Sequence, residues 1–283
     1  MRTRPFAQID VFTEMAYRGN PLAVVLDADG IDDAALARFA NWTNLSETTF
    51  ILPPTAGNAG TADYRVRIFT PSHELPFAGH PTLGTAHAWL EAGGIPRTPG
   101  TIVQECGIGL VQIRREETTG RLAFGAPPMI RSGTIDSAEL AGIVAGLGLS
   151  AHDVVDANWV DNGPGWAALL LRSAAAVLAV EPDFAALGGR SIGIVGRAGA
   201  SEHPEFEVRG FAGGVGLGED PVTGSLNASL AQWMIGAGHA PDHYLARQGS
   251  RLGRDGHVFI DRIDGQVWVG GHSVTCITGS VLL

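Results

Sequence analysis

The sequence predicts an α+β protein of two similar domains, each a mixed sheet rolled around one central helix. Two stretches of the 283 residues resemble each other, 77–85 and 218–225, and a Val-Arg-x-Phe string precedes each of them. The two copies are separated by about half the chain, which indicates an internal duplication. With His80 set over Asp220, the other shared positions are Pro81 with Pro221, Gly84 with Gly224, Thr85 with Ser225, Ala88 with Ala228 and Leu90 with Leu230.

Each copy is predicted to start a helix that is buried on all sides. Its proline falls just inside the helix, and a polar residue, His80 or Asp220, stands directly before the proline. Between Pro221 and Gly238 the sequence has no charged residue, and a helix that is apolar all round is normally enclosed by the fold. The unpaired N–H groups and the positive dipole end of such a helix bind a carboxylate or phosphate readily. We therefore expect both helix N-termini to face a shared ligand cleft. The alternative is two capped core helices without a ligand.

Hydrophobic periodicity places the other elements around these helices. One helix is expected from Asp32 to Thr43 with Asp32 as its N-cap, and another from Ser137 to Gly146. Pro127-Pro128 marks the crossing between the halves. The expected domains are residues 1–127 and 128–269, with 270–283 returning to complete the first. Strands are expected at 6–12, 22–26, 46–52 and 63–70, at several short segments within 101–124, and at 153–160, 166–171, 192–195, 205–211, 256–262 and 266–269.

The composition is that of a soluble globular protein, with 45% hydrophobic and 17% charged residues. The net charge of −10 argues against a nucleic-acid groove and against binding to an anionic membrane. The N-terminus has no apolar signal segment. We therefore expect a cytoplasmic protein in which Cys106 and Cys276 stay reduced.

The residue types also exclude several cofactors. The chain contains no lysine, since all 19 basic residues are arginine. Pyridoxal phosphate enzymes and other Schiff-base catalysts need a lysine amine, and so does the phosphate loop of nucleotide hydrolases. The glycine-rich run 214–218 lacks the full dinucleotide pattern, and the following Glu219 and Asp220 would repel a pyrophosphate. His239 and His243 have helical spacing, but the glycine and proline around them disfavour a helix there. We expect no cofactor and no metal.

Four polar residues are candidates for chemistry. Glu47 stands at the mouth of an apolar strand, where partial desolvation would suit it to proton transfer near neutral pH; a strand-end glutamate that faces water is the alternative. Histidine is a poor N-cap, so His80 at a helix start indicates contact with a ligand. Asp220 is equally compatible with plain capping. Ser225 could reach a ligand at the N-terminus of its helix, or bond back to that helix.

Four stretches, found in order through both halves, resemble the PhzF family of isomerases, which is related in fold to diaminopimelate epimerase. The most specific strings are Glu74-Leu75-Pro76-Phe77-Ala78-Gly79-His80-Pro81-Thr82 and Glu219-Asp220-Pro221-x-Thr223-Gly224-Ser225, and the others are residues 19–25 and 46–50. The resemblance covers essentially the whole chain. It implies a diaminopimelate epimerase-like fold of two half-barrel domains, a site in the cleft between them, catalysis without cofactor or metal, and a homodimer.

The resemblance also implies roles for individual residues. Glu47 would take a proton from a carbon of the substrate and return it elsewhere along a conjugated system, as in the isomerisation of a dihydro-hydroxyanthranilate. His80, Asp220 and Ser225 would position the substrate and help to shuttle protons. The substrate expected is a small, cyclic molecule that bears a carboxylate. The residues implied to bind it are Asn20, Gly79 and Gly224.

Other chemistries of the same fold stay open. The epimerase relatives use two opposed cysteines, one from each half, but neither predicted central helix carries a cysteine. The residues therefore favour acid–base chemistry by a single carboxylate. A cofactor-free amino-acid epimerase or racemase is one alternative, and a non-catalytic ligand-binding protein is another. The presence of Glu47 favours an enzyme, because a protein that only binds its ligand has no need of the base.

Overall fold

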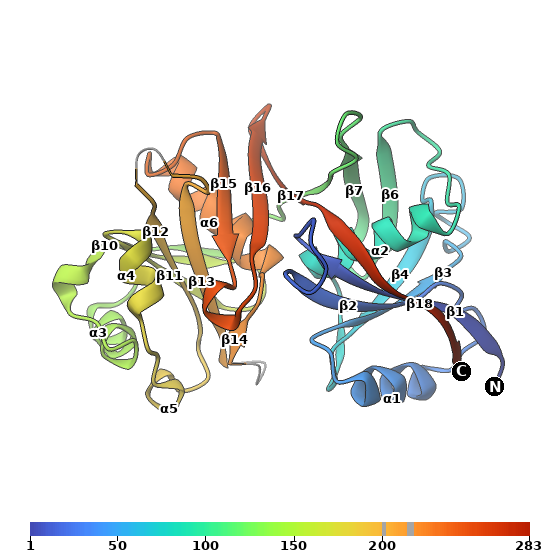
Figure 1. Cartoon of the computed structure of the whole chain (residues 1–283), viewed down its shortest axis with the longest axis horizontal. Helices are drawn as coiled ribbons and strands as arrows, with labels where there is room; N and C mark the ends of the chain where they lie inside the picture. Colours follow the sequence, from blue (N-terminus) through green and yellow to red (C-terminus); the bar gives the residue numbers. More distant parts are fainter. Residues whose placement is uncertain (200–201, 214–217) are drawn as a thin grey trace. The chain divides into compact units, whose positions relative to one another are not determined.

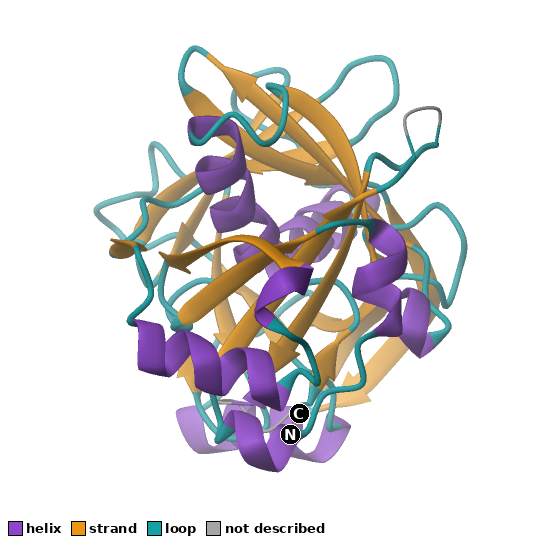
Figure 2. Ribbon diagram, turned by 90° about the vertical axis from the view of Figure 1, so that its left-hand side faces the viewer, coloured by secondary structure: helices purple, strands orange, loops and turns teal. Residues whose placement is uncertain are grey.

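The computed structural model describes residues 1–199, 202–213 and 218–283, so the glycine-rich run 214–218 lies almost entirely outside the described residues. Contacts divide the chain into two compact units, which we call the N-unit and the C-unit. The N-unit comprises Met1–Gly125 with Gly270–Leu283, and the C-unit comprises Ala126–Val269 (Figure 1). The units support the division into two domains that we propose for this chain. Strands make up most of the regular structure of both units (Figure 2).

The N-unit is a mixed sheet that surrounds helix α2 (Gly79–Glu91). The first strand pairs antiparallel with β2 and β18, β2 runs parallel to β3, and β3 pairs antiparallel with β4. β4 then pairs antiparallel with β5 and parallel with β6, and β6, β7 and β8 follow antiparallel. Helix α1 (Asp33–Thr43) connects β2 to β3. The strands are β1 (Thr3–Val11), β2 (Asn20–Val25), β3 (Thr48–Leu52), β4 (Tyr64–Phe69), β5 (Glu74–Leu75), β6 (Thr101–Cys106), β7 (Gly109–Arg115), β8 (Leu122–Gly125) and β18 (Ser273–Leu282).

The C-unit repeats this arrangement around helix α6 (Gly224–Gly236). Its parallel pairs are β11 with β12 and β13 with β15, whereas β9–β10, β10–β11, β12–β13, β13–β14 and β15–β16 are antiparallel. Helices α3 (Ser137–Gly146), α4 (Ala174–Ala179) and α5 (Phe184–Leu187) connect its strands. The strands are β9 (Arg131–Gly133), β10 (Val154–Asp161), β11 (Trp166–Leu171), β12 (Ser191–Arg197), β13 (Phe206–Ala212), β14 (Glu219–Asp220), β15 (His243–Gln248), β16 (Gly256–Ile263) and β17 (Gln266–Gly271).

The shared pairing order identifies equivalent positions in the two units. Phe69 of β4 lies opposite Glu74, and Phe211 of β13 lies opposite Glu219. The central helices that follow each have 13 residues and begin at Gly79 and Gly224. The duplication therefore pairs Glu74 with Glu219, Gly79 with Gly224 and His80 with Ser225. The alignment that set His80 over Asp220 and Gly84 over Gly224 is wrong, because it was anchored on the wrong pair of prolines. The true repeat is Glu-x-Pro-x-x-Gly, in which Pro76 matches Pro221.

The central helices are enclosed by their sheets, as their lack of charge predicts. In α2 the buried residues run without a break from Gly79 to Ala86, and α6 buries ten of its residues, from Gly224 to Ile235. Gly84 marks the closest approach in the N-unit, because a Cβ there would lie 2.7 Å from side-chain atoms of both Leu22 and Val11. This contact fixes the depth at which α2 packs against β1 and β2.

The start of α6 corrects the prediction for Asp220. Asp220 belongs to β14 and is not the N-cap; the N-cap of α6 is Thr223, so Pro221 lies before the helix and not inside it. The reason is the pairing of β14 with β13, which keeps residues 219–220 extended. Helix predictions elsewhere are confirmed, since Asp32 caps α1 by accepting from Ala35 N and α3 spans Ser137–Gly146. Helices α4 and α5 were not predicted.

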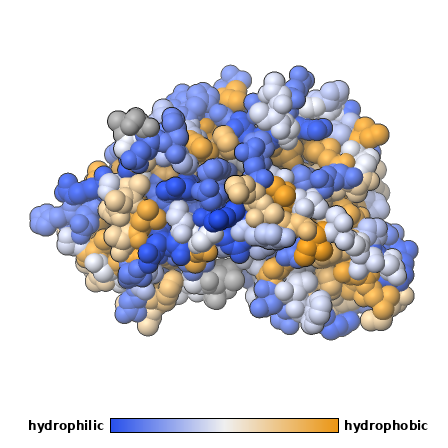
Figure 3. Space-filling view, viewed as in Figure 1, coloured by the Kyte–Doolittle hydropathy of each residue, from blue (hydrophilic) through white to orange (hydrophobic). Residues whose placement is uncertain are grey.

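The face shown in Figure 3 mixes hydrophilic and hydrophobic residues over both units. None of the helices in the described part of the chain is long and apolar enough to cross a membrane.

A bidentate arginine–glutamate pair holds the loop before each central helix. In the N-unit, Arg67 Nε and Nη2 donate to the two carboxylate oxygens of Glu74 at 2.7 and 2.6 Å. In the C-unit, Arg209 donates in the same way to Glu219 at 2.9 and 2.8 Å. The pairs differ in burial: side-chain exposure is 23% and 40% for Arg67 and Glu74, but 3% and 9% for Arg209 and Glu219. Arg209 Nη1 also donates to Val180 O at 2.5 Å, at the end of α4.

We predict that Arg209→Leu destabilises the protein far more than Arg67→Leu. The Arg209 change leaves a buried, uncompensated carboxylate, which costs about 3–5 kcal/mol. The Arg67 change removes a partly solvated pair, which is worth about 0–1 kcal/mol. Urea denaturation of the two variants, followed by circular dichroism, measures the difference in free energy of unfolding. If the two variants lose the same free energy of unfolding, solvent reaches the Arg209–Glu219 pair and the prediction is wrong.

Candidate functional site

Glu47 stands between the end of α1 and the start of β3. Helix α1 ends at Asn44, which adopts the left-handed conformation with φ 56°, and β3 begins at Thr48. The strand expected from residue 46 therefore starts two positions later, and Glu47 precedes it. The Glu47 side chain is 13% exposed, so most of it is withdrawn from water. Thr85 of α2 donates to Thr49 Oγ1 at 2.8 Å, and this bond ties the start of β3 to the central helix.

Glu47 lies beside His80, the second residue of α2. Glu47 Oε2 is 3.3 Å from His80 Nε2, and the His80 side chain is 6% exposed. On the other side of the ring, Asn20 Nδ2 is 3.5 Å from His80 Nδ1. Since an amide nitrogen only donates, Nδ1 is the acceptor and the proton of the neutral ring is on Nε2. The structure thus brings three of the predicted site residues, Asn20, Glu47 and His80, into one row.

Burial sets the charge of His80. It lowers the pKa of His80 to about 3, because the enclosed ring cannot be hydrated when protonated. The approach of His80 Nε2 to Glu47 is therefore a contact between a neutral imidazole and a carboxyl group, and not an ion pair. A neutral ring with its proton on Nε2 presents a hydrogen-bond donor to the carboxyl side.

Asn20 is placed by the turn between β1 and β2. Asp10 Oδ2 accepts from the backbone N–H groups of Arg18 and Gly19 at 2.8 and 2.9 Å, and Asp10 itself is 2% exposed. Gly19 is required there, because a Cβ would lie 2.1 Å from Val11 O. Asn20 follows in the first position of β2 and is fully buried. The Gly19-Asn20 pair therefore holds the amide against His80 rather than at the surface.

In the described part of the chain, the N-cap side chain of neither central helix makes a capping hydrogen bond. The N-caps are Ala78 and Thr223, and the first helical residues are Gly79 and Gly224. The backbone N–H groups of a first helical turn have no partner within the helix, and with the helix dipole they favour an anion. A glycine in the first position keeps side-chain atoms away from these groups.

In the C-unit, a buried network organises the residues around Asp220. Thr223 Oγ1 donates to Asp220 Oδ2 at 2.6 Å. Gln248, on β15 and fully buried, accepts from Thr223 N at 3.0 Å and donates to Thr223 Oγ1 at 2.8 Å and to Asp220 O at 3.0 Å. Its Oε1 also accepts from Asn227 Nδ2 at 2.8 Å. Thr223 N–H can only donate, so the Gln248 amide orientation is fixed, and all of its hydrogen-bonding positions are used.

Ser225 is held by the β10–β11 hairpin. Trp166 Nε1 donates to Ser225 Oγ at 3.1 Å, and Asn162 Nδ2 donates to Ser225 O at 2.8 Å. The predicted residues Asp220, Gly224 and Ser225 thus lie together at the start of α6, as Asn20, Glu47, Gly79 and His80 lie together at the start of α2.

The sequence analysis missed Thr223, Gln248 and Trp166. A single signal could have found Thr223: the Glu-x-Pro-x-x-Gly repeat places it directly before the glycine that starts the helix. Gln248 and Trp166 gave no local signal, because their roles depend on contacts with residues far away in the chain.

The two units differ at the position of the carboxyl group. Phe50 lies opposite Arg67, and Ile194 lies opposite Arg209, so these two positions are equivalent. Glu47 stands three residues before Phe50, and Ser191 stands three residues before Ile194. The C-unit therefore has a serine where the N-unit has its glutamate.

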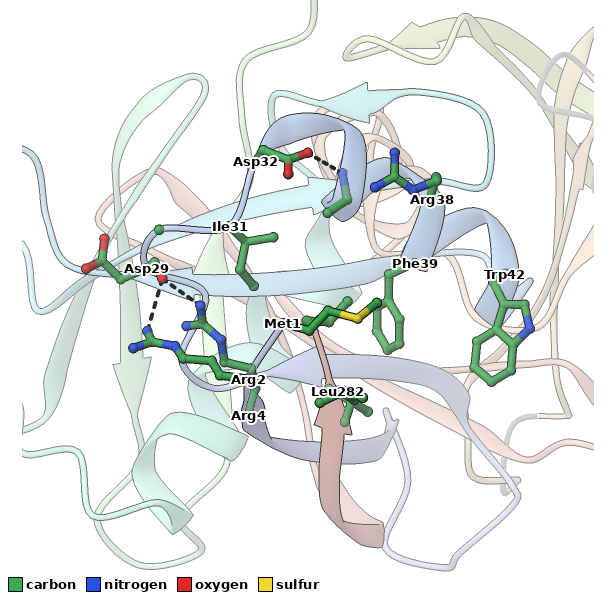
Figure 4. A pocket seen from close by; sticks show the side chains of 14 residues that line it. Met1, Arg2, Arg4, Asp29, Ile31, Asp32, Arg38, Phe39, Trp42 and Leu282 are labelled. Carbon is green, nitrogen blue, oxygen red and sulfur yellow. Dashed lines mark hydrogen bonds between the residues drawn. The ribbon is translucent and has the colours of Figure 1, made fainter.

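A hollow of about 920 Å³ lies elsewhere in the N-unit, among β1, α1 and the end of β18 (Figure 4). Arg2 and Arg4 in its wall both donate to Asp29 O, and Trp42 lies at its rim. None of the predicted site residues lines it, and two of its arginines, Arg2 and Arg4, are already engaged with protein groups. We do not assign it to the chemistry.

Metal-ligating side chains and thiols are the other groups that could carry chemistry. Within the described ranges, no cluster of three or more His, Cys, Asp and Glu side chains could hold a metal ion. Cys106 ends β6 and Cys276 lies in β18, and burial raises the pKa of both thiols. A raised pKa keeps a thiol protonated, which disfavours it as a base at neutral pH.

Comparison with known proteins adds the family. The family model PhzC-PhzF, described as phenazine biosynthesis-like protein, matches residues 9–279. Antisense-enhancing sequence 1 of Schizosaccharomyces pombe is 34% identical over 99% of both chains. Trans-2,3-dihydro-3-hydroxyanthranilate isomerase of Pseudomonas fluorescens is 33% identical over 97% of this chain and 98% of its own.

Solved structures agree. A PhzF-family phenazine biosynthesis protein of Bacillus anthracis has a TM-score of 0.81 at 24% identity and covers 100% of both chains, which shows the fold. A protein of Pseudomonas aeruginosa, described as a predicted epimerase, has a TM-score of 0.76 at 27% identity over 99% of both chains. The α+β fold class expected from the sequence is confirmed. Fold and relatives together define a PhzF-like isomerase. The chain belongs to the PhzC-PhzF family of phenazine biosynthesis-like proteins.

We predict that His80 stays neutral, with its proton on Nε2, throughout the range from about pH 5 to pH 8, because burial opposes the charged form. Long-range ¹H–¹⁵N spectra of the wild type, titrated over this range, measure its protonation state and tautomer. The His80→Gln variant assigns the signals by loss of one ring. A His80 ring that titrates near the ordinary histidine pKa of about 6.5 would contradict the prediction.

Proposed function

We propose that this protein is a cofactor-independent isomerase in which Glu47 moves a proton between two carbons of a small, cyclic, carboxylate-bearing substrate. The proposed substrate class is that of trans-2,3-dihydro-3-hydroxyanthranilate, the compound named in relatives that are 33% identical over nearly the full chain. The reaction needs no redox partner, since one C–H bond is broken, another is formed, and the double bonds shift between them.

The observation that carries the proposal is the placement of Glu47. Its carboxyl group is largely withdrawn from water, 3.3 Å from a neutral histidine, beside the uncapped end of a buried helix. A base that removes a proton from carbon benefits from partial desolvation, since water would otherwise stabilise its charged form. It must also retain the proton long enough to return it to the substrate. A neighbouring imidazole that stays neutral does not compete for that proton.

The other polar residues supply binding in this proposal. The first-turn N–H groups at Gly79 and Gly224 favour the substrate carboxylate through hydrogen bonds and the helix dipole. His80, with its proton on Nε2, donates to the group that Glu47 attacks or to Glu47 itself. Asp220 accepts from a substrate amine or hydroxyl group, and Thr223 and Gln248 hold it in place. The proposed assembly of the enzyme is a homodimer, and its proposed location is the cytoplasm.

An epimerase or racemase of a cyclic amino acid is the second candidate. The observation in its favour is the P. aeruginosa relative at 27% identity that is described as a predicted epimerase. Such a reaction usually uses a base on each face of the substrate. In this chain the position equivalent to Glu47 is Ser191, whose hydroxyl is a poor base, and this difference favours the isomerase.

We predict that Glu47→Gln lowers the rate of proton transfer by about 10²–10⁴-fold, the usual contribution of a general base. Trans-2,3-dihydro-3-hydroxyanthranilate and a panel of cyclic amino acids are incubated with enzyme in deuterated buffer, and mass spectrometry follows deuterium entry and isomer formation. Glu105→Gln is the matched control, because Glu105 is a buried glutamate of the same unit, 7% exposed, whose carboxylate accepts from Thr55 N at 2.8 Å. The control is expected to keep wild-type turnover.

The panel separates the candidates. Isomer formation with the anthranilate compound supports the proposal, whereas exchange at the α-carbon of an amino acid supports the epimerase. Wild-type turnover that persists in Glu47→Gln would remove Glu47 from its role. Saturable binding without any exchange would show a ligand-binding protein instead.

A further inference from the structure

Trp166 is in direct contact with Ser225. It begins β11, it is 2% exposed, and its Nε1–H donates to Ser225 Oγ at 3.1 Å. Ser225 is only partly buried, so its hydroxyl lies at the boundary between the core and the open end of α6. The indole is therefore the inner partner of a hydroxyl that faces outward.

The chemistry of the indole fixes the polarity of this hydrogen bond. An indole nitrogen donates and never accepts, so Ser225 Oγ is the acceptor in the contact. The hydroxyl proton of Ser225 must then point away from Trp166. A serine in the first turn of a helix often turns its proton back to a carbonyl of its own chain, but the first turn of α6 has no preceding helical carbonyl to offer. Because the Trp166 N–H occupies the lone pair of Ser225 Oγ that faces the indole, the hydroxyl proton of Ser225 is directed away from the indole.

The backbone of Ser225 is held by the same hairpin. Asn162 Nδ2 donates to Ser225 O at 2.8 Å, and Asp161 Oδ1 accepts from Gly163 N and Gly165 N at 2.7 Å each, which fixes the loop that leads to Trp166. The N-unit treats its equivalent residue in a parallel way: Asp10 fixes the turn that brings Asn20 to His80. In both units the second residue of the central helix is thus oriented by the hairpin of the first two long strands.

We propose that Trp166 is a positioning residue of the site: its indole N–H holds the Ser225 hydroxyl as a hydrogen-bond donor toward an anionic or carbonyl oxygen of the substrate. The role rests on the proposed function, together with the resemblance to the PhzF family, which implies that Ser225 positions the substrate. It also narrows the range of possible substrates, because the substrate must carry an oxygen acceptor at the point that Ser225 reaches.

A simpler explanation of the contact is that Ser225 serves Trp166, and that Trp166 does not serve Ser225. A buried indole N–H needs an acceptor, and Ser225 could serve only to satisfy it. In that case Trp166→Phe would remove the need for the acceptor and leave substrate binding unchanged. The two explanations predict different kinetics, so a double-mutant cycle separates them.

The experiment compares Trp166→Phe, Ser225→Ala and the double variant in the deuterium assay with trans-2,3-dihydro-3-hydroxyanthranilate. We expect KM to rise about fivefold to tenfold in Trp166→Phe, with kcat changed less than about twofold, since loss of uniform binding acts on KM. We expect Trp166→Phe to have almost no further effect in the Ser225→Ala background. Trp233→Phe is the matched control, because Trp233 lies on α6 and is 7% exposed. An unchanged KM in Trp166→Phe, or effects that multiply in the double variant, would overturn the proposal.

A measurement without substrate separates this proposal from the proposed function. The chain has 6 tryptophans, so its ¹H–¹⁵N spectrum contains the same number of indole signals. Trp166→Phe identifies the signal of Trp166, and Ser225→Ala is expected to shift that signal and speed its exchange with solvent, leaving the others in place. An unmoved signal overturns the role of Trp166 alone. If the Trp166 signal responds to Ser225→Ala but the wild type turns over no compound, the proposed function is overturned. The role of Trp166 in that function is then overturned as well.

Discussion

The structure depends on two helices whose only acidic or arginine residue is Glu91, at the very end of α2, and which are therefore enclosed by their own sheets. Enclosure satisfies the apolar side chains, but it leaves the backbone N–H groups at the start of each helix to be accommodated. In other helices of this chain an aspartate does this, as Asp32 does for α1 and Asp136 for α3. At the central helices the N-caps are Ala78 and Thr223. The loop before each helix is instead held by an ion pair, Arg67–Glu74 in the N-unit and Arg209–Glu219 in the C-unit. A rigid loop before an uncapped helix end is a scaffold suited to an anionic ligand.

The duplicated scaffold carries different chemistry in its two copies. The second helical residue is His80 in one unit and Ser225 in the other, and the position before the third strand is Glu47 in one and Ser191 in the other. At these positions the N-unit carries a carboxyl group and an imidazole, whereas the C-unit carries hydroxyl groups; the ionisable side chain of the C-unit site, Asp220, lies before its helix. Such divergence after duplication favours chemistry in which one base both removes and returns the proton. Two opposed bases would require the second copy to have kept an ionisable group at one of these positions.

Much of this could be predicted from the sequence, because the decisive signals are local. The absence of charge from 221 to 238 predicts a buried helix, and Asp32 and Asp136 precede recognisable helical patterns. The start of α6 could not be predicted, because Pro221 looks like a first helical residue unless one knows that β14 pairs with β13 and that Gln248 takes the N–H of Thr223. The neighbours of Glu47 could not be predicted either. Asn20, Glu47 and His80 come from three separate segments, and only the packing of α2 against β2 and β3 brings them together. Helices α4 and α5 are short and rich in alanine and have little periodicity to detect.

In the proposed reaction one carboxyl group both removes and returns the proton, and the burial of His80 is compatible with both steps. A protonated imidazole beside Glu47 would hold the carboxylate in its charged form and weaken it as a base. With its pKa near 3, the His80 ring carries no charge at the pH of the cell, and Asn20 keeps its proton on the side of Glu47. The neutral ring then stands 3.3 Å from the carboxyl group and places no positive charge beside it. In the proposed mechanism, a charged residue at the second position of α2 would favour the ionised carboxylate, so a buried, neutral side chain suits this position.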